Sequence, residues 1–174
     1  MFVFGTSWPI GKEEMREFLL PTLKPGDKIC DMGPGGGSWF NLLGPEYHWT
    51  GVEIWHETAE YLKDIYNVVY ELDLRKFDYP EDYDLVIFGD VLEHLAVPDA
   101  QAALNKARQH SNAIVVAVPY KLKQGPAYGN MAEMHLQDDL TPEIFDQRYP
   151  GFTLIRNEAN RYGYYYWRKD GVQM

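Results

Sequence analysis

Short apolar runs alternate with stretches of helical period along most of this chain. The runs predicted to be strands are residues 28–32, 48–54, 68–72, 83–88 and 113–118. Between them, residues 38–43, 57–66 and 98–109 carry apolar positions at helical spacing. Because the last two strands are apolar at nearly every position, we expect them to be buried on both faces, as strands of a parallel sheet are. This alternation predicts a doubly wound α/β fold.

The two ends of the chain add a cap and a hairpin. Residues 12–20 place Met15, Phe18 and Leu19 on one helical face before Pro21, so residues 1–23 are expected to form a short N-terminal cap. A capping Thr141 with Pro142 predicts a helix to about Tyr149. Residues 152–156 and 162–168 then form an antiparallel hairpin. We therefore predict one Rossmann-like domain over residues 1–174, with a mostly parallel seven-stranded sheet.

The segment between the fifth predicted strand and this last helix is expected to be a loop. Residues 119–129 are rich in Pro, Gly, Lys and Tyr and carry no periodic pattern. A loop of this length next to the strand ends is typical of a binding-site cover. We predict a substrate lid over residues 119–140.

Charge and composition disfavour several classes of protein and of binding partner. The net charge of −10 disfavours a nucleic acid, which is bound through a basic face. Cys30 is the one cysteine, so no disulfide can form within the chain. No apolar run approaches 18 residues, which predicts a cytoplasmic protein without a membrane segment.

A glycine-rich loop follows the first predicted strand. The segment reads Asp31-Met32-Gly33-Pro34-Gly35-Gly36-Gly37, and Ser38 is expected to cap the next helix. The dinucleotide fingerprint has a glycine where Ser38 stands, so the spacing departs from it. A carboxylate at Asp31 would repel a pyrophosphate but suits a cationic cofactor. S-adenosylmethionine, which carries a sulfonium, is such a ligand.

Acidic residues stand at the ends of four successive predicted strands, namely Asp31, Glu53, Asp73 and Asp90. In doubly wound folds a ligand lies across these carboxyl ends. Glu53 comes 22 residues after Asp31, close to the spacing of an acid that binds ribose hydroxyls. Ile54, beside Glu53, is placed to pack on the face of an adenine ring. Asp73 and the backbone of Leu74 are placed to form hydrogen bonds with the edge of that ring.

These motifs, together with Tyr83-Asp84-Leu85-Val86-Ile87-Phe88-Gly89-Asp90-Val91-Leu92-Glu93-His94-Leu95, carry a family resemblance. The chain resembles class I S-adenosylmethionine-dependent methyltransferases, in particular the ubiquinone-biosynthesis O-methyltransferase type. The resemblance implies that the backbone of Gly33, Pro34 and Gly35 binds the methionine moiety and Asp90 its amino group. It implies S-adenosylhomocysteine as the product and a small molecule, methylated at oxygen or nitrogen, as the acceptor.

Two histidines are candidates for removing a proton from the acceptor. His94 follows the fourth predicted strand and His135 follows the predicted lid, whereas His48, His56 and His110 stand at ordinary element ends. His135 is the preferred base. Asp90, Glu93, His94 and His135 are also candidates for holding a divalent metal, as similar Glu-His clusters do in related methyltransferases.

Three alternatives stay open at this level. Because the chain is short of substrate-binding insertions, it could be a non-catalytic S-adenosylmethionine-binding subunit of a larger assembly. It could also methylate RNA ends, against which the negative charge counts. A homodimer that completes the site is a further possibility.

Overall fold

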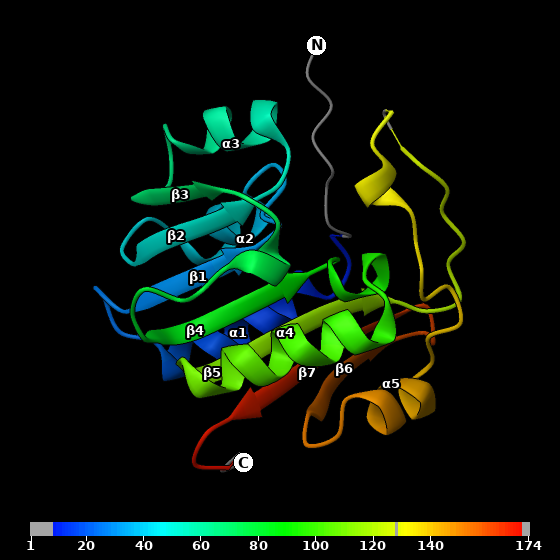
Figure 1. Cartoon of the computed structure of the whole chain (residues 1–174). Coiled ribbons are helices and arrows are strands. Elements are labelled where there is room, and N and C mark those ends of the chain that lie inside the picture. Colours follow the sequence, from blue (N-terminus) through cyan, green and yellow to red (C-terminus); the bar gives the residue numbers. More distant parts are fainter. Residues whose placement is uncertain (1–8, 128, 172–174) are drawn as a thin grey trace.

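One mixed seven-stranded sheet forms the centre of the molecule in a computed structural model that describes residues 9–127 and 129–171 (Figure 1). The strands are β1 (Lys28–Met32), β2 (His48–Glu53), β3 (Val68–Glu71), β4 (Tyr83–Gly89), β5 (Ser111–Pro119), β6 (Thr153–Glu158) and β7 (Tyr162–Arg168). Their order is β3-β2-β1-β4-β5-β7-β6. β1 to β5 pair in parallel, and β7 is antiparallel to both β5 and β6. The predicted fold class is confirmed.

Helices cover both faces of this sheet. They are α1 (Lys12–Leu19), α2 (Ser38–Leu43), α3 (His56–Leu62), α4 (Val97–Gln109) and α5 (Pro142–Arg148). Short 3₁₀ turns are η1 (Leu20–Thr22), η2 (Leu74–Lys76), η3 (Leu92–His94) and η4 (Met131–Glu133). α1, α2 and α3 contribute to one hydrophobic core, and α4 and α5 to the other. No helix in the described ranges is long and apolar enough to cross a membrane.

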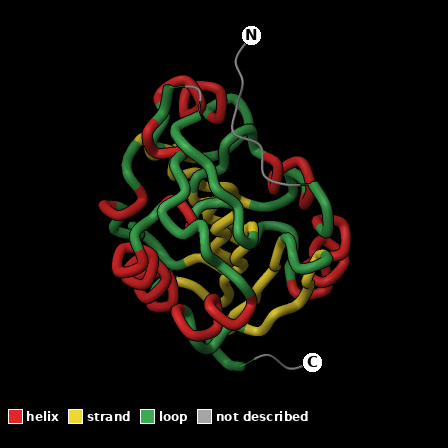
Figure 2. Tube along the Cα trace, turned by 90° about the vertical axis from the view of Figure 1, so that its right-hand side faces the viewer, coloured by secondary structure: helices red, strands yellow, loops and turns green. Residues whose placement is uncertain are grey.

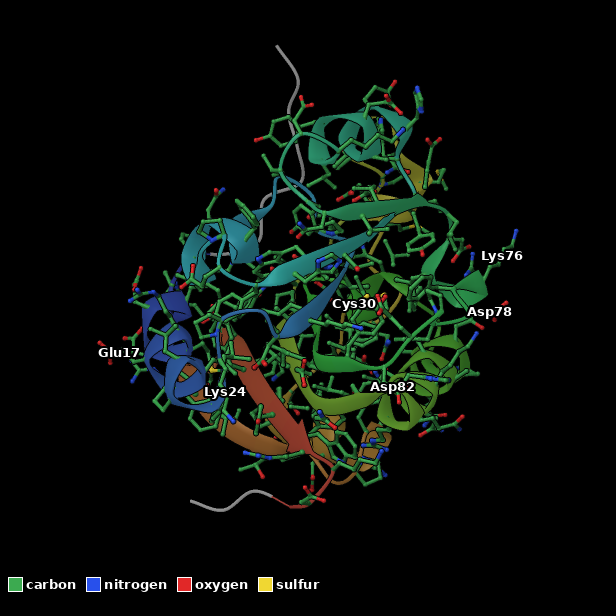
Figure 3. All side chains as sticks on the ribbon, turned by 90° about the vertical axis from the view of Figure 1, so that its left-hand side faces the viewer. Glu17, Lys24, Cys30, Lys76, Asp78 and Asp82 are labelled. Atoms are coloured by element: carbon green, nitrogen blue, oxygen red, sulfur yellow. The ribbon has the colours of Figure 1, made fainter. Side chains whose placement is uncertain are left out.

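The side chains of the central strands alternate between the two cores. Along β5, Ile114, Val116 and Val118 belong to the core under α4 and α5. Ala113, Val115 and Ala117 belong to the other core. This two-sided burial explains the nearly continuous apolar run in the sequence. Cys30 lies in the interior, as Figure 3 shows, whereas labelled charged residues such as Glu17 and Lys24 lie toward the outside.

Two element boundaries differ from the predictions. The helix predicted over residues 57–66 is α3, which ends at Leu62, and a turn continues to Tyr66 through hydrogen bonds to the Leu62 carbonyl. The prediction that Ser38 caps α2 is wrong. Gly37 is the capping residue, with a φ of 74°, and no side chain caps the helix. The Ser38 hydroxyl accepts a hydrogen bond from the Lys12 ammonium instead, at 2.7 Å.

The strand order reverses between β1 and β4, so the two neighbouring crossovers lie on opposite faces of the sheet. A crevice at the carboxyl ends of the strands is the expected ligand site of such a sheet. Figure 2 looks toward that edge, and loops cross in front of the strands. The connection from β5 to α5, drawn yellow in Figure 1, follows the same edge and contains η4. Its role as a lid stays a prediction.

Candidate functional site

A cavity of about 690 Å³ lies at this carboxyl edge. Its size falls in the range of small-molecule and cofactor pockets, about 300–1,000 Å³. Four strand-to-helix connections line it, those that follow β1, β2, β3 and β4, and the η4 segment forms another part of its wall. Of the sequence-predicted cofactor residues, the structure brings together around the cavity Gly33, Pro34, Gly35, Glu53, Ile54, Asp73, Leu74 and Asp90.

The glycine loop after β1 bends tightly against the end of β2. Gly33 has a φ of 65°, and a Cβ atom built on it would lie 2.9 Å from Val91 Cγ2, so a side chain is excluded there. The Glu53 carboxylate accepts hydrogen bonds from the backbone N–H groups of Gly35, at 3.3 Å, and Trp55, at 2.8 Å. Burial raises the pKa of Glu53 above its usual range. These contacts fix the Glu53 carboxylate at the cavity wall.

Asp90 follows β4 in an unusual backbone conformation. Its φ is 56°, which non-glycine residues rarely adopt. The Tyr162 hydroxyl, from β7, donates a hydrogen bond to Asp90 Oδ1 at 2.6 Å. Such backbone strain is found preferentially at functional sites, where the surrounding structure holds it. The Asp90 carboxylate thus has a fixed position next to the glycine loop.

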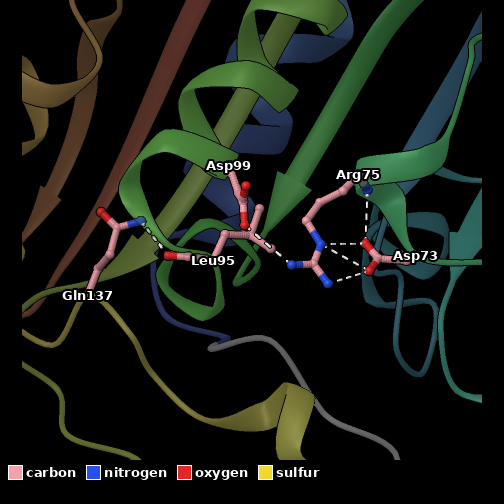
Figure 4. Close-up of polar contacts among 5 residues, drawn as sticks. All are labelled: Asp73, Arg75, Leu95, Asp99 and Gln137. Atoms are coloured by element: carbon pink, nitrogen blue, oxygen red, sulfur yellow. Dashed lines mark hydrogen bonds and ion pairs between the residues drawn. The ribbon is translucent and has the colours of Figure 1, made fainter.

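Asp73 is bound by a neighbouring arginine, as Figure 4 shows. The Arg75 guanidinium donates to both carboxylate oxygens of Asp73 and also contacts Asp99, at 3.3 Å. This ion pair holds the pKa of Asp73 below its usual value. Leu74 and Arg75 line the cavity beside it. A ligand group that bonds to Asp73 must therefore share its carboxylate with Arg75.

Asp31 does not line the cavity, contrary to the expectation that it faces a cofactor. It is 1% exposed and lies within β1, with its carboxylate accepting a 2.8 Å hydrogen bond from the Tyr66 hydroxyl. Burial raises the pKa of Asp31 to about 7, although Tyr66 and the nearby Lys12 ammonium oppose this shift and Glu53 adds to it. The charge of Asp31 acts from behind the glycine loop.

We predict that Asp31→Asn removes a pH dependence of folding. A folded-state pKa of about 7, against an ordinary 3.8, means that this group stabilises the fold most at low pH and loses that contribution as pH rises through 7. Between pH 5 and pH 8 the loss is about 2–3 kcal/mol. In urea denaturation, the free energy of unfolding of Asp31→Asn, relative to that of the wild type, should therefore rise by this amount between pH 5 and pH 8. Asp64→Asn, which changes an exposed aspartate, is the control. The same stability difference between Asp31→Asn and the wild type at pH 5 and at pH 8 would contradict the raised pKa of Asp31.

Lys12 also belongs to this region, although its sequence position did not lead us to predict it. Its side chain is buried, donates to Ser38 Oγ and lies 5.2 Å from the centre of the Trp39 ring. Its charge acts on both Asp90 and Asp31. The signal was present, because Lys12, Met15 and Leu19 occupy one face of α1 at spacings of three and four. A lysine on the buried face of an amphipathic helix predicts an anionic group near it in the interior.

The candidate catalytic histidines meet at the cavity edge. The rings of His94, in η3, and His135, after η4, lie 4.7 Å apart in an edge-to-face arrangement. His94 lines the cavity, whereas His135 is not among its lining residues. Burial and the neighbouring His135 lower the pKa of His94 to about 4. Of the two, His94 is thus the better placed toward a bound ligand.

The sequence also offers Tyr120, Tyr128 and Asn130, near His135, as residues that could orient an acceptor, and the structure does not support that role for Tyr120. Tyr120 is buried, and its hydroxyl pairs with that of Tyr165 at 2.5 Å in the core beneath α5. Tyr128 lies outside the described residues. Asn130, named with them, caps η4 by accepting a hydrogen bond from the Ala132 N–H.

The predicted four-residue metal cluster forms only in part. Glu93, His94 and His135 bring one potential ligand atom each within 4.8 Å of one another. Asp90 is not part of this group, because its unusual backbone turns it toward Tyr162 and the cavity.

Comparison with known proteins agrees with this architecture. A family model described as a methyltransferase domain matches residues 12–139. No curated protein sequence matches the chain significantly. A methyltransferase from Clostridium acetobutylicum ATCC 824, described as S-adenosylmethionine-dependent, has a similar fold with a TM-score of 0.69 and 8% identity over 92% of this chain and 91% of that one.

Two further solved structures share the fold at low sequence identity. Magnesium protoporphyrin IX methyltransferase from Synechocystis PCC 6803, with bound S-adenosylmethionine, has a TM-score of 0.58 and 18% identity over 89% of this chain and 76% of that one. Human N-acetylserotonin methyltransferase, also in complex with S-adenosylmethionine, has a TM-score of 0.66 and 20% identity over 95% of this chain. The match spans 53% of the human protein.

Proposed function

Because the chain belongs to the methyltransferase domain family, we propose that it transfers the methyl group of S-adenosylmethionine to an oxygen or nitrogen of a small-molecule acceptor. The observation that carries this proposal is the set of acids around one cavity. Glu53 ends β2, whereas Asp73 and Asp90 follow β3 and β4, and all three line the cavity with the glycine loop. A cationic sulfonium is favoured by such surroundings, whereas a pyrophosphate is repelled.

Each part of the cofactor has a suitable partner in this cavity. Glu53 offers two carboxylate oxygens to the two ribose hydroxyls, as a strand-end acid does in nucleoside-binding folds. Ile54 is half exposed at the cavity wall and offers an apolar surface to adenine. The carboxylate of Asp90 attracts the methionine ammonium, and the backbone of Gly33 and Gly35 has room for the chain beside it.

Methyl transfer is an in-line displacement, so the protein must hold the acceptor atom behind the methyl group and take away its proton. The imidazoles of His94 and His135 stand at the cavity edge for this step. The solved structures of similar fold include proteins named as O-methyltransferases and as a sugar N-methyltransferase, which supports both kinds of acceptor atom. Within the family we propose the ubiquinone O-methyltransferase type, on the strength of the motif from Tyr83 to Leu95.

A thermal-shift measurement tests this function. S-adenosylhomocysteine at about 100 times its dissociation constant should stabilise the fold by about 2.7 kcal/mol, which raises the melting temperature by roughly 5–10 °C for a chain of this size. NAD is the control ligand, because its pyrophosphate is disfavoured by the acidic cavity. A shift with NAD and none with S-adenosylhomocysteine would refute the proposal.

A further inference from the structure

A carboxylate that the mechanism does not use, that of Glu133, lines the cavity from η4. This turn lies in the connection from β5 to α5, and the side chain of Glu133 is half-buried there. The carboxylate makes no hydrogen bond or ion pair with a described residue, although the imidazole of His135 is near enough to act on its charge. A half-buried carboxylate without a protein counter-ion is a suitable partner for a positively charged group of a ligand.

Two further carboxylates lie within electrostatic reach of Glu133. Its charge acts on Glu53, at the end of β2, and on Glu93, in η3. Glu93 is 1% exposed, and neither of its carboxylate oxygens has a hydrogen-bond partner among the described residues. A cation in the region between β2, η3 and η4 would therefore stabilise the ionised form of several carboxylates at once.

The balance of charge over the whole cavity is also negative. Among the described residues, Arg75 is the one lysine or arginine that lines the cavity, and its guanidinium is already paired with Asp73. The buried Lys12 acts on Asp90 and Asp31. The carboxylates that line the cavity are those of Glu53, Glu57, Asp73, Asp90 and Glu133.

A bound cofactor does not neutralise this charge. S-adenosylmethionine carries a sulfonium, an ammonium and a carboxylate, so it brings one net positive charge, and S-adenosylhomocysteine brings none. In the proposed complex the cofactor binds Glu53 and Asp90 and leaves Glu133 to the acceptor. An anionic acceptor is repelled from the loaded cavity, whereas a cationic one is attracted, and the net charge of −10 over the chain acts in the same direction.

Apolar side chains flank Glu133 at the cavity wall. Met131 and Leu136, from the same connection, line the cavity and are 65% and 51% exposed. Leu95 and Ala96, which follow η3, line it as well. Apolar side chains around one charged group suit a ligand that has an apolar body and a charged end.

We propose that Glu133 binds an ammonium group of the methyl acceptor, so that the acceptor is an amine with an apolar body. This inference rests on the proposed function, because it places the acceptor next to the cofactor. The ammonium is the point of attachment, and the atom that receives the methyl group is an oxygen or nitrogen of the same molecule. Glu133 is then a specificity-determining residue of the transfer.

Three small compounds of similar shape separate the effect of charge from that of fit. At pH 7, 2-phenylethylamine is a cation, 2-phenylethanol is neutral and phenylacetate is an anion. Each is titrated calorimetrically, at physiological ionic strength, into the full-length protein saturated with S-adenosylhomocysteine. We expect the amine to bind at least about tenfold more tightly than the alcohol, as one charge-assisted hydrogen bond predicts. Phenylacetate should not bind.

Glu133→Gln locates the contact, because the amide keeps the shape of the side chain and lacks its charge. The affinity for the amine should fall at least about tenfold, to that for the alcohol, whereas the affinity for the alcohol stays unchanged. Glu57→Gln is the matched control, since it removes the same charge from the cavity wall in the first turn of α3. Because salt screens distant charges, the control should change the affinity for the amine by about twofold at most.

Three results would overturn the proposal. They are no preference of the wild type for the amine over the alcohol, an unchanged affinity for the amine in Glu133→Gln, and an equal loss in Glu57→Gln, which would indicate a general field and no contact. Binding of S-adenosylhomocysteine is measured first, before any amine is added. Failure of the proposed function is thus recognised at that step, separately from failure of the inference about the acceptor.

Discussion

Glu53→Ala is expected to weaken the binding of S-adenosylhomocysteine by about 10²- to 10⁴-fold. In the proposed complex, the substitution removes the acceptors of two charge-assisted hydrogen bonds from the ribose hydroxyls, each contributing about 1.5–3 kcal/mol. Isothermal titration calorimetry of the purified variant measures the change. The ribose is bound in both substrate and product, so the affinity for S-adenosylmethionine should fall equally.

Two further variants separate this effect from misfolding. Glu53 also accepts hydrogen bonds from the backbone of Gly35 and Trp55, so its loss can loosen the loop itself. Glu53→Gln keeps the shape of the side chain and one acceptor oxygen and should retain more affinity than the alanine variant. Glu60→Ala changes an exposed glutamate of α3 and should bind as the wild type does. Wild-type affinity in Glu53→Ala would show that the ribose lies elsewhere.

Much of the fold could be predicted because its signals are local. The buried strands read as apolar runs, and the glycine loop and Thr141 mark turns and helix starts. In the structure Thr141 caps α5 by accepting a hydrogen bond from the Ile144 N–H. The alternation of β1 to β5 with helices then leaves few topologies, because connections in parallel sheets are right-handed.

Side-chain direction was the part that the sequence did not reveal. Asp31 and Glu53 both stand near strand ends, but Asp31 bonds Tyr66 behind the glycine loop, whereas Glu53 lines the cavity. Successive residues of a strand point to opposite faces, so a shift of one position decides which of them meets a ligand. The burial of Lys12 was indicated locally by its place on the apolar face of α1, whereas the acids that it approaches depend on how α1 docks.

The histidine cluster shows a second limit. Both His94 and His135 were predicted to approach the cavity, and their rings do come together. The preference for His135 as the base rested on its place after the predicted lid, whereas only His94 of the two lines the cavity. Glu93 is also buried, and its carbonyl accepts hydrogen bonds from the N–H groups of Leu136 and Gln137, tertiary contacts that the sequence did not reveal.

His94→Ala is expected to lower turnover by about 10²- to 10⁴-fold, or roughly 3–5 kcal/mol of barrier, while the affinity for S-adenosylhomocysteine stays nearly unchanged. The imidazole faces the cavity, and its loss removes either a proton acceptor or one candidate ligand of a divalent metal. Turnover is measured as release of S-adenosylhomocysteine with a panel of phenol, catechol and amine acceptors. His110→Ala, at the end of α4, is the control and should behave as the wild type.

The comparison with His135→Ala decides between these two roles. If a divalent metal held by both histidines were to activate the acceptor, both residues would be needed, and both variants should lose turnover to a similar extent because each removes one candidate ligand. If His94 instead takes the proton directly, His135→Ala should retain most of the activity, since its ring is not among those that line the cavity. Turnover within about threefold of wild type in His94→Ala would exclude both roles, and positioning of the acceptor alone would then account for the reaction.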